Sequence, residues 1–150
     1  MAVPDFTQYG LLPPGVHPCS FPEARAALCL NDRRSEIWQG LQNFLNWAQA
    51  FPPPDSFLLD GSYVTDKPLP NDVDVVVDVT NCSEDEQQQW IAAWADHREY
   101  AKATFFVDFY PVFVGVGNDF SAFFQYVRID EAMRRGIAPT VRKGILKVTL

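Results

Sequence analysis

The sequence predicts an α/β (α+β) fold in which a small mixed β-sheet is covered by two main helices. Apolar residues recur at helical spacing in two segments, and runs of β-branched and aromatic residues mark several strands. Helices and strands interleave along the chain, which is typical of a layered α/β structure. The 150 residues are 47% apolar and 21% charged, so residues 1–150 are expected to form a single domain with one core.

The N-terminal residues 1–24 are expected to form an extended arm. Proline fixes φ and lacks a backbone N–H group, which disfavours a helix in this segment. The apolar side chains of Leu11 and Leu12 indicate that the arm packs on the domain. The prolines of the arm are Pro4, Pro13, Pro14, Pro18 and Pro22.

Two amphipathic helices follow from the apolar periodicity. Residues 32–50 place apolar side chains on one side of a helix, and the proline run 52–54 ends it. Ser83 and Glu86 have the spacing of a capping box, which opens a second helix that fades near Tyr100.

The remaining segments are predicted to be strands and turns. Gly61, Pro68, Pro70 and Asn71 mark residues 61–71 as a loop. A helix or turn is expected over 119–127 and a turn over 130–135. Strands are expected over 57–60, 73–79, 104–109, 112–116 and 144–150, with Pro111 separating the third from the fourth.

The charge balance excludes some classes of partner. The chain has 12 basic and 19 acidic residues and a net charge of −7, so general DNA binding and a polybasic membrane contact are not expected. Half of the basic residues lie in the last 23 positions, where they form either a solvated face or a positive wall for a phosphorylated ligand. These residues are Arg128, Arg134, Arg135, Arg142, Lys143 and Lys147.

The cysteines and the apolar pattern indicate a cytoplasmic protein. The three cysteines form no CxxC pair, which favours a reducing compartment over a disulfide scaffold. The N-terminus does not have the pattern of a signal peptide, and no run reaches the ~18 apolar residues of a membrane span.

The segment from Gly61 to Asp74 carries the chemistry. Nine residues separate Gly61-Ser62 from Asp72-Val73-Asp74, which opens a strand. Strand side chains alternate, so Asp72 and Asp74 share a face and repel each other unless a cation lies between them. Oxygen-ligated Mg²⁺, usually held by carboxylates together with substrate phosphates, is the natural partner.

Asp108 is the candidate for a third carboxylate. It lies in an aromatic, β-rich run, where a charge is costly to bury unless it is paired or bound to a metal. Gly61 and Ser62 would then present a backbone N–H and a hydroxyl to a phosphate. Asp60, directly before Gly61, is expected to accept a hydrogen bond in the turn.

These residues resemble the polymerase-β-type nucleotidyltransferase superfamily, and in particular its small stand-alone members, the minimal nucleotidyltransferases. The resemblance implies that Asp72, Asp74 and Asp108 hold two Mg²⁺ ions and that Asp108 also activates the acceptor hydroxyl. It implies further that Gly61 and Ser62 hold the phosphates of an NTP. Minimal nucleotidyltransferases often carry an arginine after Gly-Ser, whereas the nearest cation here is Lys67, which is assigned to nucleotide binding.

A wider resemblance covers most of the chain. Leu12–His17, Gly61–Lys67 and the ending Lys143-Gly144-Ile145 resemble a family of uncharacterised bacterial and phage proteins that sequence assigns to the same superfamily. That wider resemblance implies no established activity.

The function expected from these features is Mg²⁺-dependent transfer of a nucleoside monophosphate from an NTP to a hydroxyl of an acceptor. Larger relatives append an acceptor-binding domain for which this chain has no length. The acceptor is therefore expected to be a toxin-like protein partner, an RNA or a small molecule, or a second copy of the chain in a homodimer. The resemblance also admits an antitoxin role. The main alternative is a catalytically inactive protein-binding module with the same fold, and a weaker one is a synthase of oligonucleotide second messengers.

Overall fold

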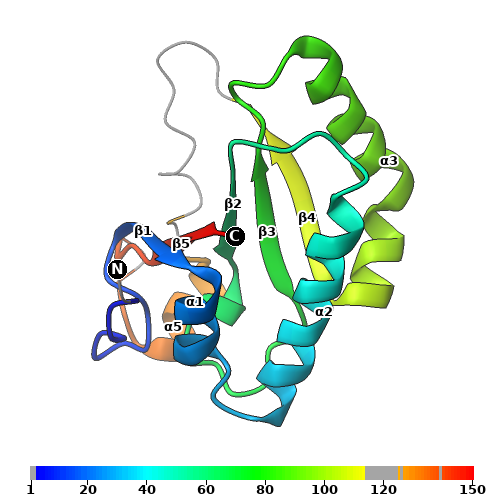
Figure 1. Ribbon diagram of the computed structural model, residues 1–150. Coiled ribbons are helices and arrows are strands. Elements are labelled where there is room, and N and C mark those ends of the chain that lie inside the picture. The colour runs from blue at the N-terminus through cyan, green and yellow to red at the C-terminus, as the bar shows by residue number, and fades with distance from the viewer. Residues whose placement is uncertain (1–2, 114–124, 126, 139) are drawn as a thin grey trace.

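The computed structural model contains a mixed five-stranded sheet with α-helices packed against it (Figure 1). It describes residues 3–113, 125, 127–138 and 140–150. The predicted mixed α/β class is confirmed. The strands are β1 (Gly15–Ser20), β2 (Ser56–Asp60), β3 (Val73–Asp78), β4 (Val107–Val112) and β5 (Gly144–Thr149).

The sheet has the strand order β1-β5-β2-β3-β4. The outer pairs, β1 with β5 and β3 with β4, are parallel, whereas β2 is antiparallel to both of its neighbours. The N-terminal and C-terminal strands therefore pair with each other. The segment that holds the candidate site residues Gly61 to Asp74 runs from the end of β2 into β3, in the middle of the sheet.

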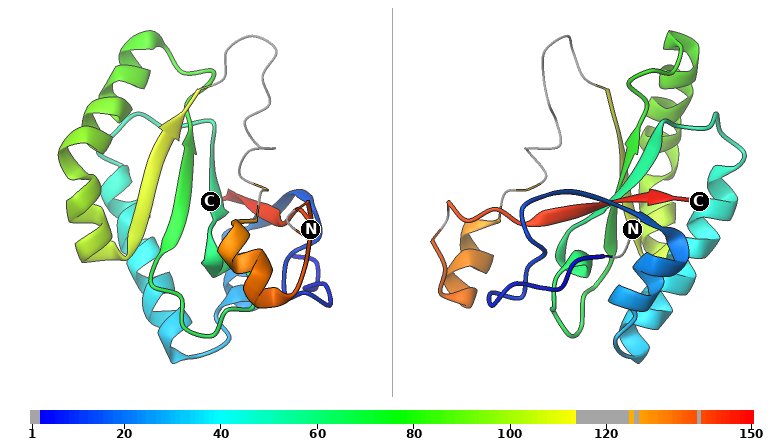
Figure 2. Two further views of the ribbon diagram at one scale, coloured as in Figure 1. Left: turned by 180° about the vertical axis from the view of Figure 1, so that it is seen from behind. Right: turned by 60° about the vertical axis from the view of Figure 1, so that its left-hand side comes forward.

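Three helices cover one face of the sheet, and a fourth lies on the other side (Figure 2). Buried side chains of the first three helices join those of every strand in one core, which includes Leu28, Phe44, Trp90 and Phe109. Among the described residues no helix is long and apolar enough to cross a membrane. The helices are α1 (Phe21–Leu28), α2 (Asp32–Ala48), α3 (Glu84–Phe105) and α5 (Ile129–Arg135).

The N-terminal segment differs from the predicted arm. Residues 15–20 are extended but belong to the sheet as β1, and a helix that the sequence analysis missed begins at Phe21. Ser20 and Glu23 form a capping box, and Pro22 lies in the first turn, where its missing N–H group costs no hydrogen bond. Proline content alone therefore misjudged residues 21–24, whereas Leu11 and Leu12 are buried against the domain, as expected.

The predicted break between two strands around Pro111 is also wrong. Helix α3 continues through Phe105, because Trp90, Ala101 and Phe105 recur on its buried side. Strand β4 then runs without a break to Val112, and Pro111 is accommodated because β4 is an edge strand.

The C-terminal third contains one more correction. The turn predicted over 130–135 is the helix α5, which ends at Gly136 in the left-handed conformation (φ 67°). Acidic residues in its first turn and arginines in its last turn favour this helix. The predicted strand residues 114–116, and all of 119–127 except 125 and 127, lie outside the described residues.

Candidate functional site

Three carboxylates form a row across neighbouring strands. In the register of the sheet Asp60 of β2 pairs with Asp74 of β3, and Asp74 pairs with Asp108 of β4. Asp72 lies two positions before Asp74 and therefore on the same face. The two segments that the sequence analysis linked only by hypothesis are thus adjacent in space.

Alternation along β3 explains why the carboxylates share a face. Val73, Val75 and Val77 belong to the core beneath the helices, so the residues between them point to the opposite face. Farther along the strands, that opposite face is apolar: Val76 packs there with Leu58, Ile145 and Tyr110. The acidic row therefore lies beside an apolar patch on the same face of the sheet.

Gly61 allows the turn after β2 to lie against Asp74. Its φ of 81° is in the left-handed region that favours glycine. A Cβ atom at this position would lie 2.6 Å from Asp74 Oδ2. A side chain at position 61 would consequently displace the central carboxylate of the row.

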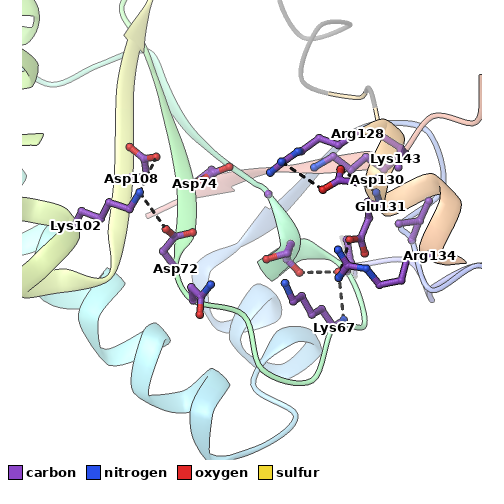
Figure 3. Close-up of a pocket in the computed structure, with 16 residues that line it drawn as sticks. Lys67, Asp72, Asp74, Lys102, Asp108, Arg128, Asp130, Glu131, Arg134 and Lys143 are labelled. Atoms are coloured by element: carbon purple, nitrogen blue, oxygen red, sulfur yellow. Dashed lines mark hydrogen bonds and ion pairs between the residues drawn. The ribbon is translucent and has the colours of Figure 1, made fainter. Parts of the chain in front are cut away.

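One pocket of about 410 Å³ contains all six residues that the sequence analysis singled out (Figure 3). Its volume lies in the usual range of small-molecule sites, ~300–1,000 Å³. The carboxylates at the start of β3 and on β4 lie on one side, and Arg128, just before α5, and Arg134 of α5 lie across from them. The six residues are Gly61, Ser62, Lys67, Asp72, Asp74 and Asp108.

The basic side of the pocket includes Arg128 and Arg134. Their side chains are 85% and 59% exposed and pair with Asp130 and Glu131, which also line the pocket. The positive wall considered in the sequence analysis is therefore mixed in charge. Its exposed guanidinium groups can still contact a polyanionic ligand.

The start of α2 holds the loop that joins Ser62 to Asp72. Arg34, which is 1% exposed, donates hydrogen bonds to the backbone carbonyls of Thr65 and Lys67. Arg33 donates to the carbonyls of Pro70 and Asn71. The loop is therefore anchored at several carbonyls, although it has little regular secondary structure.

Two lysines neutralise part of the acidic row. Lys143 Nζ lies 2.6 Å from Asp60 Oδ1, and both side chains are largely buried. Lys102 Nζ lies 3.9 Å from Asp72 Oδ2 and 3.9 Å from Asp108 Oδ2, and its side chain is 55% exposed. One lysine is thus fixed inside the site and the other bridges its open side.

The carboxylates raise one another's proton affinity. Burial raises the pKa of Asp74 to about 7, and the charges of Asp72, Asp60 and Asp108 contribute, while Lys143 opposes the shift. Burial also raises the pKa of Asp72, against the opposing charge of Lys102. The site therefore carries more negative charge than its lysines offset.

The donor chemistry of this pocket fits a hard divalent cation. Carboxylate oxygens are ligands of Mg²⁺, and an added positive charge would relieve the repulsion that, after burial, contributes to the raised pKa of Asp74. Within the described part of the chain, no three His, Cys, Asp or Glu side chains are gathered closely enough to hold an ion by themselves. Mg²⁺ commonly completes such a site with water and substrate phosphates.

Sequence reasoning missed four residues of the site. Asp60 was expected only to accept a hydrogen bond in the turn. Lys143 was placed only within the group of C-terminal basic residues, and Lys102 and Tyr110 received no role. Burial, the charges of Asp74 and Asp60, and a hydrogen bond with Asp74 raise the pKa of Tyr110. Alternation from Asp108 could have placed Tyr110 on the acidic face, whereas the positions of both lysines depend on tertiary structure.

Comparison with known proteins gives one family. A model of the family of unknown function DUF6932 matches residues 4–149, so the chain belongs to this family. No curated protein and no solved structure matches the chain.

Proposed function

We propose that this DUF6932 member is a Mg²⁺-dependent nucleotidyltransferase. It transfers a nucleoside monophosphate from an NTP to a hydroxyl group of an acceptor. The observation that carries the proposal is the row Asp60, Asp74 and Asp108, with Asp72 beside it and the Gly61 turn in contact with it. The resemblance of these motifs to minimal nucleotidyltransferases adds support.

The reaction is an in-line substitution at the α-phosphorus. The acceptor oxygen forms a bond to phosphorus, the bond to the bridging oxygen of the β-phosphate breaks, and pyrophosphate leaves. Asp108, at the open edge of the row with its side chain 22% exposed, takes the proton of the acceptor hydroxyl. Positioning and charge therefore supply most of the catalysis.

The other residues of the pocket bind the nucleotide. Gly61 and Ser62 line the pocket. In the proposed complex the Gly61 backbone and the Ser62 hydroxyl contact the phosphates, with Lys67, Arg128 and Arg134 offsetting phosphate charge. Asp72, Asp74 and Asp108 would hold two Mg²⁺ ions. When bound, these ions would stabilise charge on the attacking and leaving oxygens.

The choice of acceptor rests on the resemblance to minimal nucleotidyltransferases and not on the shape of the pocket. Minimal nucleotidyltransferases often modify a toxin partner as antitoxins, so we propose a cytoplasmic toxin-like protein or an RNA as the acceptor. A second copy of the chain in a homodimer is the remaining candidate.

The alternative is a catalytically inactive module that binds a protein. Lys102 bridges Asp72 and Asp108, so a lysine already supplies part of the positive charge that a metal ion would bring. In that case the carboxylates would have a structural role only, and variants that lack them would still bind the partner protein.

Two measurements distinguish these functions. ATP, GTP, CTP and UTP are titrated with Mg²⁺ into the wild type, the double variant Asp72→Asn/Asp74→Asn and the exposed control Asp96→Asn. Label from an α-³²P nucleotide is then followed into cellular protein and RNA. The proposal expects binding and transfer by the wild type and the control only. Absence of nucleotide binding by the wild type at millimolar concentration would refute it.

A further inference from the structure

Lys102 is held less tightly than Lys143, the other lysine that pairs with a carboxylate of the acidic row. Lys143 is 12% exposed and makes a short contact with one carboxylate, Asp60. Lys102 is 55% exposed and lies at 3.9 Å from one oxygen each of Asp72 and Asp108. These distances are at the long end for ion pairs, and the lysine stem has four rotatable bonds. Of these two lysines, Lys102 is therefore the one that can leave its carboxylates at low cost.

Lys102 lies between two of the carboxylates of the site. Its ammonium group joins a carboxylate that precedes β3 to one on β4, across the open side of the row (Figure 3). It projects from the last turn of α3, so its backbone is fixed while its side chain reaches into the pocket. Of the described cations that line the pocket, Lys102 is the one paired with two of the three carboxylates proposed to hold Mg²⁺.

We infer that Lys102 is a resident counter-cation, which occupies the place between Asp72 and Asp108 until a divalent cation displaces it. This inference rests on the proposed function only in treating the pocket as a divalent-cation site. Before it is displaced, Lys102 competes with other cations for the two carboxylates. A divalent cation must therefore bind strongly enough to displace the lysine. Removing its charge is expected to make metal binding tighter, not weaker.

The opposite role for Lys102 gives the opposite result. If the ammonium group stayed in place and helped to hold the bound state, its removal would weaken binding. Lys102 acting only as a surface charge would leave binding unchanged apart from a general effect of net charge. Metal affinity therefore separates the three roles without any measurement of transfer.

The test uses Mn²⁺ alone as the probe, because free Mn²⁺ is counted directly by its electron paramagnetic resonance signal. Wild type, Lys102→Met and Lys102→Arg are titrated at low ionic strength without nucleotide. Lys147→Met is the matched control, since Lys147 is an exposed lysine of β5 outside this pocket. Thermal melting of each variant without metal verifies that it is folded.

Lys102→Met is expected to bind Mn²⁺ about fivefold more tightly than the wild type, as removal of one charge at ~4 Å in a solvated site implies. Lys102→Arg and Lys147→Met should stay within about twofold of the wild type, and added salt should shrink the difference. Equal or weaker binding by Lys102→Met, an equal gain in Lys147→Met, or no Mn²⁺ binding by any variant would overturn the inference. Tighter Mn²⁺ binding without nucleotide transfer would instead count against the proposed function alone.

Discussion

Arg34 and Tyr63 hold each other by two hydrogen bonds that run in opposite directions. The Arg34 guanidinium donates to the backbone carbonyl of Tyr63 at 2.8 Å, and the Tyr63 hydroxyl donates to the backbone carbonyl of Arg34 at 2.7 Å. The guanidinium carbon also lies 4.9 Å from the centre of the Tyr63 ring. This pair joins the start of α2 to the turn that follows Gly61-Ser62, so the helix layer positions the turn that we propose to contact the phosphates.

Replacing Arg34 by methionine is expected to destabilise the protein by about 3 kcal/mol, because several buried carbonyl groups lose their donor together. Leu28, Tyr63 and Thr65 each have a carbonyl that accepts from this side chain. Urea unfolding followed by circular dichroism measures the change. Arg25→Met, at an exposed position of α1, is the control and should change the free energy of unfolding by less than about 0.5 kcal/mol. Similar losses in both variants would contradict the anchoring role of Arg34.

Gly61→Ala is expected to cost about 2 kcal/mol or more, since it adds a Cβ clash with Asp74 to the strain of a positive φ. The chain provides a matched control in Gly136, which has a φ of 67° but no atom within 4 Å of an added Cβ. Gly136→Ala should show the strain alone, about 1 kcal/mol. The difference between the two free energies of unfolding isolates the close approach of the turn to the acidic row. If the two variants lost the same stability, the Gly61 turn would not depend on contact with Asp74.

Local patterns in the sequence were sufficient for the elements around the site. The valines of β3 and the capping box at Ser83 act within a few residues, so the strand and the start of α3 followed from periodicity and hydrogen-bonding chemistry. The common face of Asp72 and Asp74 followed from strand alternation. These inferences needed no knowledge of the rest of the fold.

Register between strands could not be predicted in the same way. Asp60 faces Asp74 because β2 and β3 pair at one specific offset, and Lys143 reaches Asp60 from 83 positions along the chain. The helical end of α3 was missed because Thr104 and Phe105 have strand propensity, which packing of Phe105 against Phe44 overrides. Contacts between distant segments decide these features, and a single sequence does not encode them locally.

The free energy of unfolding of the metal-free protein should depend on pH through Asp74. The folded protein retains a proton on this carboxyl up to about pH 7, whereas the unfolded chain releases it near its ordinary pKa of 3.8. The folded state thus binds more protons between these values, so the contribution of Asp74 to stability falls as pH rises through this window and levels off above it. The slope is at most about 1.4 kcal/mol per pH unit.

Asp74→Asn provides the reference for that measurement. Urea unfolding is measured in the presence of a chelator at several pH values from about 5 to about 8. The free energy of unfolding of the wild type should fall relative to that of the variant as pH rises to about 7, and the offset between the two should then become constant. Asp96→Asn, at an exposed position of α3, should follow the wild type at every pH. Parallel curves for wild type and Asp74→Asn would mean that burial and the neighbouring carboxylates do not raise the pKa of Asp74.

The pair Asp60–Lys143 is expected to behave as a coupled unit in a double-mutant cycle. Lys143→Met leaves the Asp60 carboxylate, only 5% exposed, without its cation and beside Asp74, so a loss of about 3 kcal/mol is expected. Adding Asp60→Asn removes the unpaired charge and should recover about 1 kcal/mol or more, although two substitutions are then present. The exposed pair Arg128–Asp130 serves as the control, and its cycle should show coupling below about 1 kcal/mol. Additive losses at Asp60 and Lys143, measured by urea unfolding, would show that the two charges do not stabilise each other in the acidic row.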